Sequence, residues 1–212
     1  MKRAFTLAEV LIVLGIMGIV AALTMPSLIA NHRKKIVTTR IQKFYTTINQ
    51  AMDRAEVRHG QVKHWKYPTN AYTPDQVETW WNTYLGPEIK TLKTEKDRSY
   101  FYIYFMDGSK VNFFVHNTTA GAAVGSMPAF HIYFFPKASD NATSMGKTHF
   151  TFFFSPSTEN FIKTYNNGWN GKRETLMTGT YGCAQNTNTK HYCTKLLEWH
   201  NWQIPDDYPH RF

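Results

Sequence analysis

Residues 2–27 read KRAFTLAEVLIVLGIMGIVAALTMPS, and this stretch decides how the rest of the chain is organised. Residues 5–25 are 21 residues with one charged side chain, Glu9. A helix of that length covers about 30 Å, the thickness of the hydrocarbon core of a bilayer. Lys2 and Arg3 precede the apolar run and Pro26 follows it. The stretch therefore predicts a helix that enters a membrane.

Glu9 is the feature that a simple membrane anchor does not explain. A carboxylate within a membrane helix costs about 2.5–3.5 kcal/mol on insertion scales. That cost is offset where a positively charged group docks against the carboxylate. Glu9 also lies one turn from the start of the helix, where the helix dipole favours negative charge, and this is the simpler interpretation of its position.

The same residues resemble the N-terminus of type IV pilins and of the pilin-like subunits of type II secretion and DNA-uptake systems. In that family, a short basic leader and a small residue precede Phe-Thr-Leu-x-Glu, which opens a long apolar helix. The corresponding residues here are Lys2-Arg3-Ala4-Phe5-Thr6-Leu7-Ala8-Glu9. Gly18 and Pro26 also fall where the family often has Gly and Pro. The resemblance covers about the first 30 residues and is highly specific.

The resemblance implies a processing step and an assembly contact. A membrane peptidase would cut between Ala4 and Phe5 and methylate the new amino group of Phe5. Glu9 would pair with the Phe5 amine of a neighbouring subunit during assembly. Gly18 and Pro26 would form a helix break that unwinds as the filament forms. Ala4 departs from the family pattern, which usually has Gly before the cut.

Two other interpretations of the N-terminal stretch are a cleaved secretory signal peptide and a plain single-span anchor. The apolar run is longer than the usual core of a signal peptide, and Glu9 interrupts it. Residues 22–24, Ala-Leu-Thr, make a poor small-x-small cleavage site. Both interpretations are therefore disfavoured against the pilin-like one.

The chain of 212 residues leaves enough length after the apolar stretch for one sizeable domain. Its formal net charge is +9, which suits anionic partners such as DNA or lipid headgroups, or serves solubility alone. A minor pilin of DNA uptake, with a basic nucleic-acid-binding head, is therefore the alternative function. No phosphate loop, Gly-x-Ser-x-Gly or His-Glu-x-x-His is present, so no enzyme activity is expected.

The two cysteines, Cys183 and Cys193, lie close together in the sequence. This spacing favours a disulfide in an oxidising compartment, with two free thiols as the alternative. A zinc site of Cys183, His191, Cys193 and His200 matches none of the usual spacings. The cysteines and the resemblance together place the N-terminus in the cytoplasm of a bacterial cell. The protein is then a single-pass inner-membrane protein before assembly, with a periplasmic or extracellular head.

The chain beyond Pro26 predicts a second helical half and then an α+β head. Apolar residues recur every three or four positions from Val37 to Ala55, and Gly60 is a natural helix end. Thr73-Pro74-Asp75-Gln76 predicts the capped start of a helix that runs to Leu85. A further short helix is expected over residues 191–199.

Four runs of aromatic and β-branched residues predict the sheet. They cover residues 100–105, 110–115, 130–135 and 149–154. Asp107-Gly108 between the first two is a strong hairpin signal. We therefore expect an antiparallel sheet of about four strands, one face of which covers the apolar stripe of the long helix.

The residues together predict a pilin-like structural subunit of a type IV pilus or a type II secretion pseudopilus. Its parts are a leader (1–4), a transmembrane and assembly helix (5–30) and a head (31–212), which divides into an amphipathic helix (31–59) and a globular part (60–212). The expected partners are other pilin-like subunits, the prepilin peptidase, an inner-membrane assembly platform, membrane lipid and, in the alternative, nucleic acid. No cofactor is expected. Calcium is disfavoured because residues 140–148 carry a single acid, Asp140.

Overall fold

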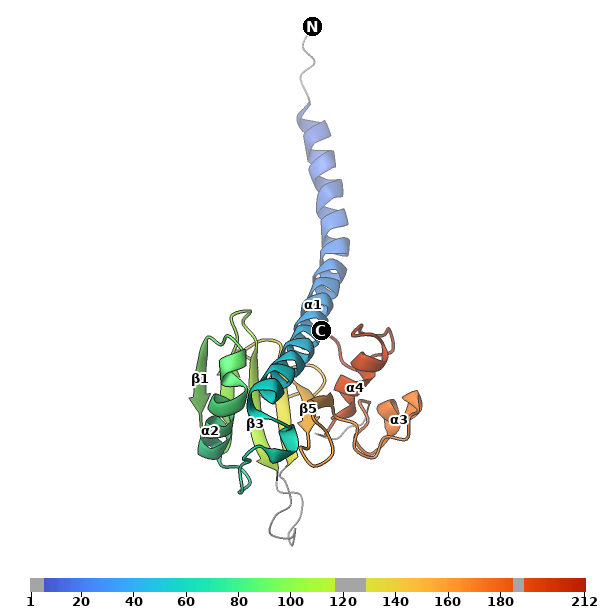
Figure 1. Ribbon diagram of the computed structural model, residues 1–212. Helices are drawn as coiled ribbons and strands as arrows, with labels where there is room; N and C mark the ends of the chain where they lie inside the picture. The colour runs from blue at the N-terminus through green and yellow to red at the C-terminus, as the bar shows by residue number, and fades with distance from the viewer. Residues whose placement is uncertain (1–5, 117–128, 185–188) are drawn as a thin grey trace.

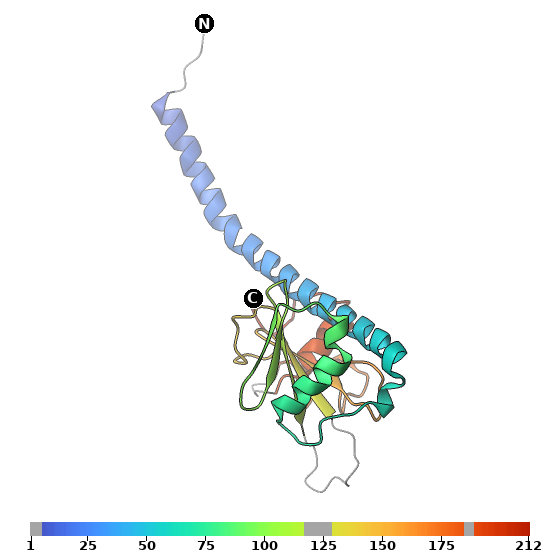
Figure 2. The same ribbon diagram turned by 60° about the vertical axis from the view of Figure 1, so that its left-hand side comes forward.

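The computed structural model describes residues 6–116, 129–184 and 189–212. The longest element of the described chain is one helix of 53 residues, α1 (Leu7–His59). Its first half projects away from the rest of the chain, and its second half lies against a sheet (Figure 1; Figure 2). The long helix followed by an antiparallel sheet confirms the predicted α+β class.

The second half of α1 is held to the head by an apolar stripe. Its buried residues recur at three- and four-residue intervals, as one face of a helix requires: Ile41, Phe44, Ile48, Ala51, Met52 and Ala55. The helix ends at the predicted glycine, since Gly60 has φ +80° and its N–H donates to Glu56 O at 2.9 Å. A positive φ is readily adopted only by glycine, which explains the stop at this position.

The sheet has six strands rather than about four, and each strand pairs antiparallel with the next in the order β1 to β6. The strands are β1 (Lys93–Lys96), β2 (Phe101–Tyr104), β3 (Lys110–His116), β4 (Ala129–Phe135), β5 (Phe150–Phe154) and β6 (Lys163–Thr164). The four central strands are the predicted ones. The two missed strands are the edges, and neither has an apolar run that could mark it in the sequence.

The hairpin between β2 and β3 forms as predicted. Gly108 adopts φ +79°, and its N–H donates to Phe105 O at 3.2 Å. Asp107 supports the turn, because its Oδ1 accepts from the Ser109 hydroxyl at 2.6 Å and from the Ser109 N–H at 3.0 Å. The turn aligns Tyr104 with Lys110 and thereby sets the register of both strands.

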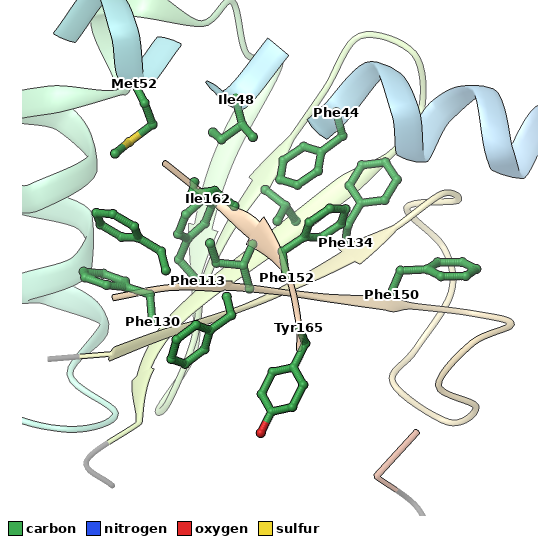
Figure 3. Close-up of a cluster of buried hydrophobic side chains, with 14 of the residues drawn as sticks. Phe44, Ile48, Met52, Phe113, Phe130, Phe134, Phe150, Phe152, Ile162 and Tyr165 are labelled. Carbon is green, nitrogen blue, oxygen red and sulfur yellow. The ribbon is translucent and has the colours of Figure 1, made fainter. Parts of the chain in front are cut away.

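Helices α1 and α2 cover the same face of the sheet. Phe44 of α1 stacks on Phe134 with ring centres 4.6 Å apart, and Phe152 lies 5.2 Å away (Figure 3). Helix α2 (Pro74–Tyr84) places Trp80 4.7 Å from the ring of Phe130. Pro74 opens α2 as predicted.

The side-chain cap predicted for Thr73 at the start of α2 does not form. The Thr73 hydroxyl donates to Asn70 O at 2.8 Å, and the Gln76 Oε1 accepts from the Thr69 N–H at 2.8 Å. Both side chains therefore form hydrogen bonds with the backbone of the preceding loop instead of with the first turn of the helix.

The C-terminal third wraps the edge of the sheet near β5 and β6. It contains α3 (Arg173–Thr178) and the predicted α4 (Tyr192–Trp199). The short 3₁₀ turns Val62–His64 and Gly86–Glu88 flank α2. The final segment returns to α1, where the Trp202 ring lies 5.2 Å from Tyr45. Tyr208 is buried, and its hydroxyl donates to Gly146 O at 2.5 Å.

The buried histidine His149 makes the head sensitive to acid. Its ring stacks on Phe135 at 5.4 Å, and its Nδ1 lies 3.3 Å from the Thr148 hydroxyl. Burial, with a smaller effect of His191, lowers the pKa of His149 from 6.5 to about 4. Between these values the unfolded chain binds the proton and the folded chain does not. Stability should therefore fall by about 3 kcal/mol as the pH is lowered from 6.5 towards 4.

The variant His149→Gln should flatten this pH dependence, which urea unfolding at a series of pH values measures. His64→Gln, at an exposed position, is the matched control and should keep the wild-type slope. An unchanged slope in His149→Gln would contradict the assignment to His149.

Candidate functional site

The first half of α1 is an apolar surface with no partner among the described residues. Its large side chains are exposed from Leu7, at 80%, to Ile29, at 50%. The only charge among residues 7–29 is Glu9. At the standard rise these 23 residues span about 34 Å, which suffices to cross a bilayer. Among the described residues, α1 is the one helix long and apolar enough to do so.

Glu9 forms a reciprocal cap with Thr6 at the start of α1. The Thr6 hydroxyl accepts from the Glu9 N–H at 3.3 Å. The Glu9 Oε2 accepts from the Thr6 N–H at 2.8 Å and from the Thr6 hydroxyl at 2.9 Å. This capping box satisfies two backbone donors that the helix leaves unpaired at its start. The Thr-x-x-Glu spacing is the sequence signal for the role of Thr6, which the pilin pattern alone does not assign.

The carboxylate keeps capacity for a further donor. Both bonds from Thr6 go to Oε2, and Oε1 accepts no hydrogen bond from a described residue. The side chain is exposed on the helix surface. Glu9 can therefore cap its own helix and bind an outside cation at the same time. The predicted processing residues Ala4 and Phe5 lie outside the described residues.

The predicted helix break at Gly18 and Pro26 is absent from this structure, because α1 is continuous through both residues. Proline removes one backbone hydrogen-bond donor, but the neighbouring turns of α1 stay helical. The hydroxyl of Thr24 donates to Val20 O at 2.9 Å, and that of Ser27 donates to Thr24 O at 3.0 Å. Unwinding of this segment in a filament stays a prediction.

Two family models match the chain, and they meet near Pro26. Residues 27–212 match the "Family of unknown function (DUF6613)". The chain belongs to this family. Residues 1–25 match the "Prokaryotic N-terminal methylation motif". No curated protein and no solved structure matches the chain.

The methylation motif is the signature of type IV pilins and pseudopilins, so the predicted resemblance is confirmed. It supports a pilin-like subunit that assembles with other pilin subunits and is processed by the prepilin peptidase. Proteins with this signature are structural subunits rather than enzymes. This member of the DUF6613 family thus joins a pilin-type first half of α1 to residues 27–212, which the DUF6613 model describes.

Cys183 and Cys193 form a disulfide that joins the end of the α3 region to α4. Both residues are fully buried, and the Cys183 N–H donates to Leu176 O at 2.8 Å. Gly146 packs directly on the bond, because a Cβ at that position would collide with the sulfur of Cys193. The bridge thereby fixes the C-terminal third against the loop that precedes β5.

The disulfide conflicts with a zinc site at the cysteines. Cys183, Cys193 and His210 bring their ligand atoms within 4.8 Å of one another. Zinc binds thiolates, and sulfurs bonded to each other cannot supply them. For calcium, the only paired acids near the C-terminus are Asp206 and Asp207, and Arg173 Nη2 donates to both oxygens of Asp207 at 2.7 and 2.8 Å. The absence of a metal stays a prediction.

Proposed function

We propose that this protein is a filament subunit that waits in the inner membrane and polymerises through the first half of α1. One observation carries the proposal: a continuous apolar helix surface over residues 7–29, exposed throughout and interrupted by one carboxylate. A helix apolar on all sides is stable only in lipid or against other apolar helices. Both surroundings are available to a subunit that moves from a membrane into a filament.

In this proposal Glu9 determines how the α1 helices of neighbouring subunits align along their axes. In lipid its charge is costly, and an amine on a neighbouring chain offsets that cost only when the two helices are aligned. The amine in this proposal is the N-terminus of Phe5, created by cleavage after Ala4. The Oε1 of Glu9 supports this pairing, because no described residue donates to it and it leaves room for the new donor beside Thr6.

The proposed orientation places Lys2 and Arg3 in the cytoplasm and the head on the far side of the membrane. The disulfide between Cys183 and Cys193 supports this arrangement, since such bonds persist in oxidising compartments. A type IV pilus and a type II secretion pseudopilus both use subunits of this kind. The DNA-uptake alternative predicts that the head binds DNA with an affinity that falls steeply as salt rises.

The test is mass spectrometry of the N-terminus of the membrane-extracted protein, from cells with and without the prepilin peptidase. We expect a methylated Phe5 terminus that depends on the peptidase. An intact Met1 in both strains would leave α1 a plain anchor, and a terminus beyond Met25 would make residues 1–25 a signal peptide. Either result would refute the proposal.

A further inference from the structure

A groove of about 700 Å³ lies at the end of the head from which α1 emerges. Its walls come from α1, from the β2–β3 turn at Gly108, from the loops after β4 and before β5, and from Phe212. The C-terminus lies beside α1 at this same end of the head in both views (Figure 1; Figure 2). The volume is typical of a site for a small ligand.

The groove begins within the headgroup layer if residues 7–29 span the bilayer. Arg33 lies four residues after Ile29, about 6 Å along the helix axis, and Ile36 lies seven residues after Ile29, about 10 Å along it. The polar layer on each side of a bilayer is about 5–8 Å thick. Arg33 and Ile36 are both exposed and both line the groove. The end of the groove at Arg33 is therefore at the depth of the phospholipid headgroups, and the rest of the groove extends from there away from the bilayer.

The groove is basic. Four cationic side chains line it, against one acidic side chain, that of Asp140. The cations are Arg33, Arg40, Lys137 and Lys147. None of these four forms an ion pair within the described part of the chain. Arg40 is positioned by the loop, because its Nη1 donates to Pro136 O at 2.6 Å.

Apolar side chains complete the lining. Ile36 and Val37 come from α1, and Pro136 and Phe212 lie across from them. Guanidinium and ammonium groups bind phosphate through charge-assisted hydrogen bonds, and the apolar side chains can pack against the carbon atoms of a glycerol headgroup. A basic, partly apolar groove that opens at headgroup depth matches the headgroup of a phospholipid better than a free anion.

We propose that this groove binds the headgroup of an anionic phospholipid from the leaflet on the head side of the membrane. The proposal rests on the membrane anchoring proposed above. The bound lipid would fix the height and tilt of the head relative to the bilayer before assembly, because it connects α1 to the β4–β5 loops at the membrane surface.

The test uses the full chain, purified in detergent and mixed with equal amounts of phosphatidylglycerol and phosphatidylcholine. Native mass spectrometry measures which lipid stays bound. We expect wild type to retain phosphatidylglycerol. Near an anionic surface each basic residue contributes about a fivefold increase in affinity, so Lys137→Gln with Lys147→Gln should weaken the binding about twenty-fivefold.

The matched control is Lys63→Gln with Lys66→Gln. It removes the same charge from two exposed lysines that follow the far end of α1. This variant should keep the wild-type preference for phosphatidylglycerol. Equal loss in both double variants would mean that overall charge attracts the lipid, and no loss in either would mean that the groove does not bind it. Either result overturns the proposal.

Three further results would also overturn it. If the chain inserts in membranes but shows no preference between the two lipids, the groove proposal is wrong and the proposed anchoring stands. If the wild-type chain is absent from the carbonate-washed membrane fraction, the proposed membrane anchoring is wrong as well. Binding of duplex DNA that depends on Lys137 and Lys147, without a lipid preference, would assign the groove to nucleic acid.

Discussion

Replacing Glu9 with glutamine should abolish incorporation of the protein into filaments and leave its membrane insertion intact. Glutamine keeps the length of the side chain and an oxygen that can accept from the Thr6 N–H, so the cap at the start of α1 should survive. It removes the negative charge that the Phe5 amine of a neighbouring subunit would need. The variant thus separates the two roles of Glu9.

The expected loss is large because the pairing takes place in an apolar environment. An amine and a carboxylate about 4 Å apart attract one another by about 4 kcal/mol at an effective dielectric constant of 20. That exceeds the insertion cost of about 2.5–3.5 kcal/mol for the carboxylate. Loss of even 3 kcal/mol at each subunit contact weakens it about a hundredfold, which a filament of repeated contacts cannot tolerate.

Thr6→Ala is the control for the capping role. It removes the hydroxyl that accepts from the Glu9 N–H, at a cost of about 1 kcal/mol to the helix, but keeps the charge. Filaments sheared from cells and membrane fractions from the same cells measure both outcomes by immunoblot. Thr6→Ala should assemble and Glu9→Gln should not. Normal assembly of Glu9→Gln, or equal failure of both variants, would reject the pairing between subunits.

The main elements of the fold could be predicted because their sequence patterns are strong. The stripe from Ile41 to Ala55 has helical spacing, and the four aromatic runs form the central strands. Strand β1, Lys-Thr-Glu-Lys, is exposed along its whole length and exists only because it pairs with β2. Strand β6 has two residues, and α3 buries only Leu176. Such short, tertiary-dependent elements have no pattern of their own.

Some parts of the candidate site could be predicted from the sequence and others could not. The pilin motif and Glu9 could be found from local spacing, because all of their residues lie within one helix start. The groove could not, since Arg33, Lys137 and Lys147 come together only through the packing of α1 on the β4–β5 loops. The break predicted at Gly18 and Pro26 concerns the assembled filament and stays a prediction, and in the single chain α1 is continuous through Pro26. A proline removes one backbone hydrogen bond from a long helix, and the hydrogen bonds of the neighbouring turns keep α1 continuous.

Replacing Phe152 with alanine should destabilise the head by about 3–5 kcal/mol. Phe152 is fully buried on β5, and its ring meets two rings of α1, Phe44 at 5.2 Å and Tyr45 at 6.0 Å. The substitution opens a cavity directly beneath the helix that carries the assembly surface. For a domain of this size the melting temperature should fall by about 6–20 °C, as near-UV circular dichroism of the detergent-solubilised protein measures.

Phe161→Ala is the matched control, because the same atoms are removed from a ring that is 40% exposed. It should change the melting temperature much less than Phe152→Ala does. Equal effects of the two substitutions would contradict the placement of Phe152 in the interface between α1 and the sheet.

A double-mutant cycle identifies the helix–sheet contact itself. Phe44 and Phe152 share one packed site, so the second truncation enlarges a cavity that the first has already opened (Figure 3). The double variant should therefore lose less stability than the sum of the single variants, by about 0.5–3 kcal/mol. Additive losses would mean that the two rings act independently and that α1 is held to the head elsewhere. Coupling within this range would show that α1 and the sheet form one cooperative unit, so that a force on the assembly half of α1 is transmitted to the core of the head.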